Sequence, residues 1–111
     1  MTVPRFDSAK VLTVGDAMID RYLHGDAKRI SAEAPIPVVE VKEIEDRLGG
    51  AANVALNVST LGAESYLVAA TGSDVAAREL KDKLKASNIN STLLKDPLKP
   101  TTIKVRLVSQ N

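Results

Sequence analysis

The sequence contains no cysteine and only one histidine, His24. The absence of cysteine excludes disulfides, thiolate catalysis and cysteine-bound zinc. A lone histidine argues against a metal site built from imidazoles. We therefore expect no metal ligands among these residues, and we interpret His24 as a surface residue.

An excess of charge of either sign is also lacking. The chain has 15 basic and 14 acidic residues, so its net charge of +1 gives no electrostatic reason to expect nucleic acid or an acidic membrane as a partner. No apolar run is long enough to span a bilayer, and the first residues, "MTVPRFDSAK", lack the apolar centre of a signal peptide. The expectation is a cytoplasmic protein without a nucleic-acid or membrane partner.

What the sequence does contain is a series of strand patterns. The apolar runs from Lys10 to Asp16 and from Ser65 to Thr71 are typical of buried strands. The short run "STLL" predicts a third strand. Residues 102–109, "TIKVRLVS", alternate between polar and apolar side chains and predict a fourth.

Two helices are expected between these strands. The first runs from about Gly50 to Leu61 and ends at Gly62, a typical residue for the position after a helix. Asp74 can cap the second, which runs from Val75 to about Ala86. The alternation of strands and helices predicts an α/β fold with a parallel sheet. A doubly wound sheet needs more strands, so the sequence is interpreted as the front of a larger domain, with an uncovered apolar face.

Residues 17–48 differ from this alternation. Pro35, Pro37 and Gly25 interrupt short β-prone pieces, and proline belongs at the edges of sheets. These residues are expected to form a small exposed sheet outside the main core.

The stretch "RLGGAANVALNVSTLGA" places two glycines directly before an uncharged helix. Gly49 and Gly50 would let a ligand approach the unpaired N–H groups of the helix start without meeting a Cβ atom. Asn53, in the first turn, offers a donor and an acceptor together, which suits a sugar hydroxyl. A tight glycine turn, with asparagine bonded to nearby backbone, is an equally good explanation of these residues alone.

Charged residues near strand ends are further candidates for a binding site. Asp16 and Asp20 follow the first strand, where open α/β sheets bind ligands, and Asp20 could accept hydrogen bonds from vicinal hydroxyls. Asp16 is more simply a turn residue. Lys104 and Arg106 share one face of the last strand and could bind a phosphate, although a solvated strand face is the simpler explanation. Neither a dinucleotide-binding nor a P-loop motif is present, which disfavours a Rossmann oxidoreductase.

Three segments, "VGDAMIDRY", "RISAEAPIPVVEV" and "GGAANVALNVSTLGA", together resemble the amino-terminal part of the ribokinase-like (PfkB) carbohydrate kinases. The resemblance runs from Val11 to Ser109. "GGAAN" resembles the first signature of this family. The segments around "DRY" and "RIS" are similar to a subgroup in which a heptose 7-phosphate kinase domain is joined to a heptose 1-phosphate adenylyltransferase.

The resemblance implies a ribokinase-like doubly wound sheet, of which residues 1–111 form the amino-terminal portion, with a β-sheet lid at about 17–48. In this family the lid often also forms a homodimer. The resemblance further implies that Asp20, Gly49, Gly50 and Asn53 line the sugar pocket. The catalytic aspartate, ATP and Mg²⁺ are expected at sites beyond Asn111, so these 111 residues alone are expected to be inactive.

The function implied is the ATP-dependent phosphorylation of D-glycero-D-manno-heptose 7-phosphate at C1, in the biosynthesis of ADP-heptose and the lipopolysaccharide core. Two alternatives stay open. One is another ribokinase-like kinase of a sugar or nucleoside, and the other is a non-catalytic module that binds carbohydrate or dimerises.

Overall fold

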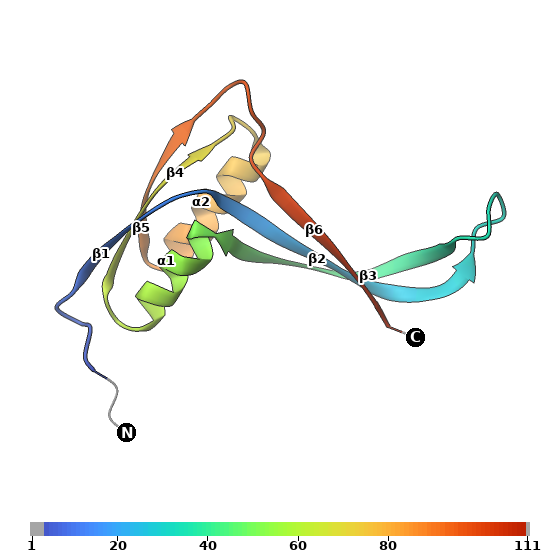
Figure 1. The fold of residues 1–111 in the computed structure, drawn as a ribbon, viewed down its shortest axis with the longest axis horizontal. Helices are drawn as coiled ribbons and strands as arrows, with labels where there is room; N and C mark the ends of the chain where they lie inside the picture. Colours follow the sequence, from blue (N-terminus) through green and yellow to red (C-terminus); the bar gives the residue numbers. More distant parts are fainter. Residues whose placement is uncertain (1–3, 111) are drawn as a thin grey trace.

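The computed structural model describes residues 4–110, which form two three-stranded sheets and two helices (Figure 1). The expected α/β fold is confirmed. The first sheet has three parallel strands in the order β1-β4-β5, and the second has the order β3-β2-β6, with β3 antiparallel and β6 parallel to β2. The elements are β1 (Lys10–Val14), β2 (Ala17–Ile30), β3 (Pro37–Gly50), α1 (Ala51–Thr60), β4 (Glu64–Thr71), α2 (Val75–Ala86), β5 (Ile89–Lys95) and β6 (Ile103–Gln110).

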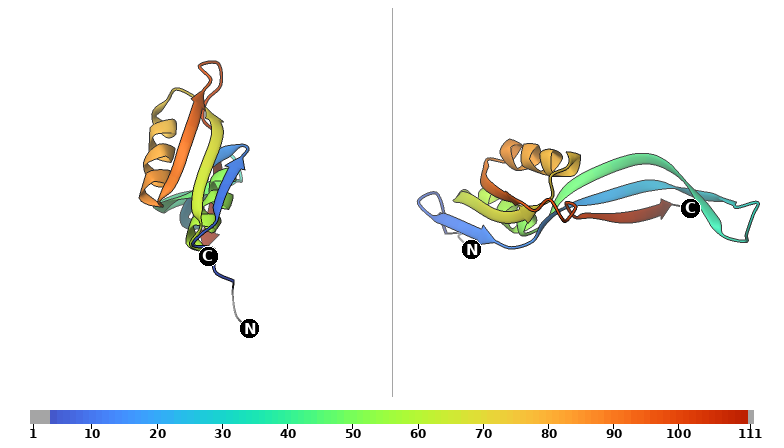
Figure 2. Two further views of the ribbon diagram at one scale, coloured as in Figure 1. Left: turned by 90° about the vertical axis from the view of Figure 1, so that its left-hand side faces the viewer. Right: turned by 90° about the horizontal axis from the view of Figure 1, so that it is seen from above.

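The core lies between the first sheet and the two helices. Alternate residues of β4, from Ser65 to Thr71, are buried, and those that are apolar pack with Ala52 and Ala55 of α1 and with the α2 leucines Leu80 and Leu84. Figure 2 shows α2 lying along one side of this sheet. Burial of these side chains supplies the main stabilising term of the fold.

No described helix or strand covers the opposite face of the first sheet. Leu12 and Val14 of β1 are 60% and 69% exposed, and Leu94 of β5 is 58% exposed. The sequence predicted a buried strand at 10–16; the strand is confirmed at Lys10–Val14, but its predicted burial was wrong, because most of its side chains are exposed. β1 is an edge strand, and its apolar character faces the side that lacks helices.

Strands β2 and β3 form a long hairpin that extends away from the first sheet (Figure 1). This hairpin is formed by the residues for which the sequence predicted a small exposed sheet. β6 adds a third strand to it along the other edge of β2. Within residues 4–110, neither helix is long and apolar enough to cross a membrane.

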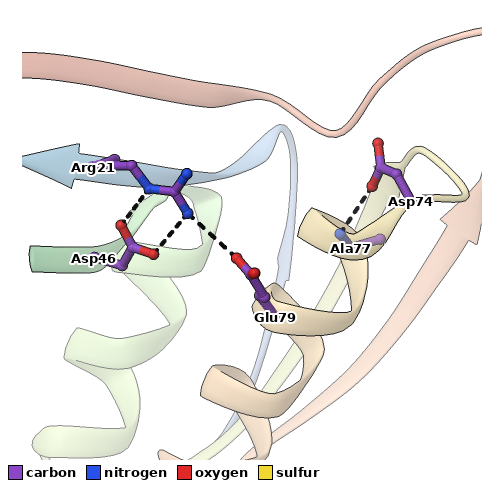
Figure 3. Close-up of polar contacts among 5 residues, drawn as sticks. All are labelled: Arg21, Asp46, Asp74, Ala77 and Glu79. Carbon is purple, nitrogen blue, oxygen red and sulfur yellow. Dashed lines mark hydrogen bonds and ion pairs between the residues drawn. The ribbon is translucent and has the colours of Figure 1, made fainter. Parts of the chain in front are cut away.

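Arg21 joins this second sheet to helix α2 (Figure 3). Its guanidinium donates two hydrogen bonds to the Asp46 carboxylate, at 2.8 and 2.9 Å, and one to Glu79 of α2 at 3.3 Å. The bond from Arg21 holds the pKa of Asp46 below its usual range. The bidentate geometry fixes β2 against β3, and the Glu79 contact fixes both against α2.

Asp74 caps α2, as the sequence predicted, and also holds the loop that leads into β6. Its carboxylate accepts the Ala77 N–H at 2.9 Å (Figure 3). It also accepts the Thr101 hydroxyl at 2.6 Å and the Thr101 N–H at 2.9 Å. The bonds from Thr101 are the first cause of a lowered pKa of Asp74.

This lowered pKa makes stability depend on pH. A carboxyl whose pKa is lower in the folded state stabilises the fold above its unfolded pKa and loses that contribution as the pH falls. We expect Asp74→Asn to lower the free energy of unfolding at about pH 7. The variant should also lose less stability than the parent between about pH 5 and pH 2. Urea unfolding across this range measures both effects. Asp82→Asn, which changes an exposed side chain on the same helix, is the control. The prediction would be contradicted if the free energy of unfolding of Asp74→Asn fell with decreasing pH as steeply as that of the parent.

Candidate functional site

One face of the second sheet gathers most of the side chains that the sequence singled out. In the strand register, Asp20 lies opposite Arg47 of β3 on one side and Lys104 of β6 on the other. Side chains alternate along a strand, so residues at every second position project from the same face. We call this the polar face; it comprises Asp20, Tyr22, His24, Glu43, Glu45, Arg47, Gly49, Lys104 and Arg106.

The Asp20 carboxylate lies directly over Gly49. A Cβ atom on Gly49 would lie 2.7 Å from Asp20 Cγ and Oδ1, so a side chain here would displace the Asp20 carboxylate from its present position. Asp20 Oδ1 is buried and has no hydrogen-bond partner within residues 4–110. A buried acceptor without a partner is costly to a fold. The arrangement therefore suits an acceptor that serves a ligand.

Gly50 and Asn53 follow Gly49 in the sequence, at the start of α1. Gly50 is the N-cap residue, with a φ of 59° that disfavours any residue with a side chain. The Asn53 side chain is exposed in the first turn and has no hydrogen-bond partner among the described residues. Asp16 acts through its backbone, because its carbonyl accepts the Ala51 N–H at 2.7 Å while its side chain is exposed.

Tyr22 occupies the middle of the polar face, and the sequence did not identify it as a site residue. The guanidinium carbon of Arg47 lies 4.5 Å from the centre of the Tyr22 ring, and that of Arg106 lies 6.0 Å from it. The His24 ring stacks on Tyr22 at 6.2 Å. Tyr22 and Arg47 each lie within a sequence segment described above. Their contact depends on the pairing of β2 with β3, which neither segment predicts by itself.

The charges of this face are unevenly balanced. Glu45 accepts two hydrogen bonds from Arg47, each at 3.0 Å, and lies 3.3 Å from His24. Arg47 first, and His24 second, lower the pKa of Glu45, so this carboxylate is ionised and offsets the charge of Arg47. Lys104 and Arg106 form no ion pair within the described residues. The β6 edge of the polar face is therefore positive.

This arrangement is equipped to bind a polyhydroxylated or anionic ligand. Asp20 supplies an acceptor for hydroxyl groups, and β6 supplies cations. In the part of the chain that the structure covers, no group of three or more histidine, aspartate or glutamate side chains is placed to hold a metal ion.

Comparisons of the sequence with protein families and with curated proteins identify its relatives. Residues 8–111 match the family described as pfkB family carbohydrate kinase. All 111 residues align at 52% identity with the protein named Bifunctional protein HldE of Pseudomonas savastanoi pv. phaseolicola and with that of Ectopseudomonas mendocina, covering 23% and 24% of those proteins. The chain thus spans about a quarter of the length of these curated relatives.

Solved structures agree on the fold. The chain is similar to a structure described as a putative phosphofructokinase from Staphylococcus aureus, with a TM-score of 0.72 at 21% identity, covering 92% of this chain and 31% of that one. It is also similar to the microbiome-derived acarbose kinase Mak1, with a TM-score of 0.72 at 30% identity, covering 92% and 33%. The likeness to the first of these, at such low identity, concerns the fold alone.

The position of Asp20 leads to a prediction about stability. Removing a buried oxygen that has no partner costs a fold little, so Asp20→Ala should leave the free energy of unfolding within about 0.5 kcal/mol of the parent, or raise it. Asp46→Ala, which removes a paired carboxylate from the same sheet, is the matched control and should cost about 1–3 kcal/mol. Chemical unfolding of both variants is the measurement. An equal loss from both would assign Asp20 to the fold rather than to a ligand.

Proposed function

Since the chain belongs to the pfkB family of carbohydrate kinases, we propose that it forms the sugar-binding part of a cytoplasmic kinase that phosphorylates heptose 7-phosphate at C1. The observation that carries this proposal is the buried Oδ1 of Asp20, which has no hydrogen-bond partner among residues 4–110 and lies over a glycine that leaves room for it. Support for the heptose comes from the 52% identity with HldE proteins along the entire chain. The product would enter the synthesis of ADP-heptose and the lipopolysaccharide core.

Each proposed contact uses a feature of the polar face or of the adjoining helix start. Asp20 accepts hydrogen bonds from sugar hydroxyls. Gly49 and Gly50 let the sugar ring approach the backbone closely, and Asn53 adds an amide in the first turn of α1. Lys104 and Arg106 of β6, which form no ion pair with the described residues, bind the phosphate that the substrate already carries.

ATP is the proposed phosphoryl donor, and Mg²⁺ would neutralise charge on the transferring group. The described residues do not fit a metal ion, since no suitable cluster of ligands is present among them. The contribution of these residues is therefore to bind and orient the acceptor sugar.

The test uses a whole kinase that carries these 111 residues, such as the HldE protein of P. savastanoi with its matching segment replaced. Asp20→Asn and Asn53→Ala should each lower kcat/KM for heptose 7-phosphate about tenfold to a hundredfold, a loss of roughly 1–3 kcal/mol. The KM for ATP should barely change, because these residues contact only the sugar.

Asp82→Asn is the control for these kinetics, because this side chain is exposed on α2 and lies outside the polar face. Normal sugar kinetics in both site variants, combined with a lowered melting temperature, would contradict the proposal. Fructose 6-phosphate and adenosine, assayed in parallel, test the alternative acceptors.

We also propose that two copies of the chain associate through the second sheet. The face opposite the polar face exposes three apolar side chains at or beyond the position of Arg21, namely Ile44, Val105 and Leu107, each more than half exposed. Exposed apolar groups of this kind favour association with a partner. A second copy would cover them and leave the polar face accessible to substrate.

Leu107→Lys should weaken dimerisation about tenfold or more, because it places a charge in the proposed interface. Leu12→Lys is the matched control, since Leu12 is equally exposed but lies on the first sheet. Sedimentation equilibrium of the 111-residue chain measures both dissociation constants. Loss of the dimer in Leu12→Lys, with Leu107→Lys still dimeric, would refute association through the second sheet.

A further inference from the structure

A second basic site lies away from the polar face, where β4 and β5 end and α2 begins. A cavity of about 480 Å³ opens there, and its lining includes Thr71, Arg78, Lys81 and Lys95. We propose that this cavity binds a phosphate monoester. None of its lining residues belongs to the second sheet, so the cavity shares no residue with the proposed sugar site.

Three cations, those of Arg78, Lys81 and Lys95, line the cavity together with one carboxylate, that of Asp74. Arg78 and Lys81 are three residues apart on α2 and so lie on one side of the helix. Lys95 reaches the cavity from the end of β5. None of the three forms an ion pair within residues 4–110. Glu79, which follows Arg78, is bonded instead to Arg21 (Figure 3).

The Thr71 hydroxyl is the second, independent indication of a ligand. Thr71 is 4% exposed, and its Oγ1 has no hydrogen-bond partner in the described residues. It pairs with Lys95 in the strand register and lines the same cavity. The backbone around it is fully used, because the Thr71 carbonyl accepts the Asp96 N–H at 2.7 Å and the Gly72 N–H donates to Thr101 at 2.9 Å. A buried hydroxyl without a partner costs stability, and a phosphate oxygen would accept its proton.

The start of α2 adds a third attraction for an anion. The first N–H groups of a helix lack partners within it and carry partial positive charge. Asp74 also lines the cavity, but its carboxylate is occupied by Ala77 and Thr101, and three cations outnumber its single charge. The volume falls in the range of small-molecule sites and exceeds what an inorganic phosphate fills, which favours a phosphate with an organic group attached.

The test is a titration of the ¹⁵N-labelled chain with glycerol 3-phosphate, followed by amide chemical shifts. We expect saturable shifts at residues 71–78 and 95, and weaker binding of inorganic phosphate. The double change Arg78→Ala with Lys95→Ala should weaken binding about tenfold to a hundredfold. Thr71→Val, which keeps the shape and removes the hydroxyl, should weaken it about threefold to tenfold without lowering the melting temperature.

Lys85→Ala is the matched control, an exposed lysine at the other end of α2, and should leave the affinity unchanged. Glycerol itself should produce no shifts. The proposal is overturned if the shifts do not saturate, if they are confined to Lys104 and Arg106, or if Thr71→Val binds like the parent. Equal affinity for inorganic phosphate would overturn the assignment of a monoester.

Discussion

Strand β2 is paired along both edges, with β3 on one side and β6 on the other, and this double pairing decides where each candidate side chain lies. It places Asp20 between Arg47 and Lys104, and the next outward residue, Tyr22, between Glu45 and Arg106. Because the side-chain period of a strand is two, a slip of one residue would carry this whole set to the opposite face. The register is therefore the condition on which the polar face depends.

The opposite face of β2 holds that register. Ile19 is fully buried and packs with Leu48 in the core, so the inner end of the sheet cannot turn over without exposing apolar surface. One position further out, Arg21 bonds Asp46 with two hydrogen bonds and reaches Glu79 of α2. Beyond Arg21, the apolar side chains of Ile44 and Leu107 are more than half exposed, and no residue of this outer part belongs to the core cluster of the described chain.

Local features could be predicted from the sequence, and features that depend on strand pairing could not. The limits of α1, the Gly62 stop and the Asp74 cap follow from residues within one or two turns of each other, and the structure confirms all three. The burial of β1 was predicted wrongly because it depends on what covers the sheet. Tyr22 was missed because Arg47, which lies over it, is 25 positions away, and only the hairpin register brings the two together.

The loop before β6 ties the two basic sites to one piece of backbone. Thr101 is bonded to Asp74 at the start of α2, beside the cavity, and to the Gly72 N–H. The next carbonyl, that of Thr102, accepts the Ile19 N–H of β2 at 3.1 Å. Two successive residues thus attach β6 to α2 and to the second sheet. The positions of Lys104 and Arg106 on the polar face therefore depend on hydrogen bonds made at the same helix end that lines the cavity.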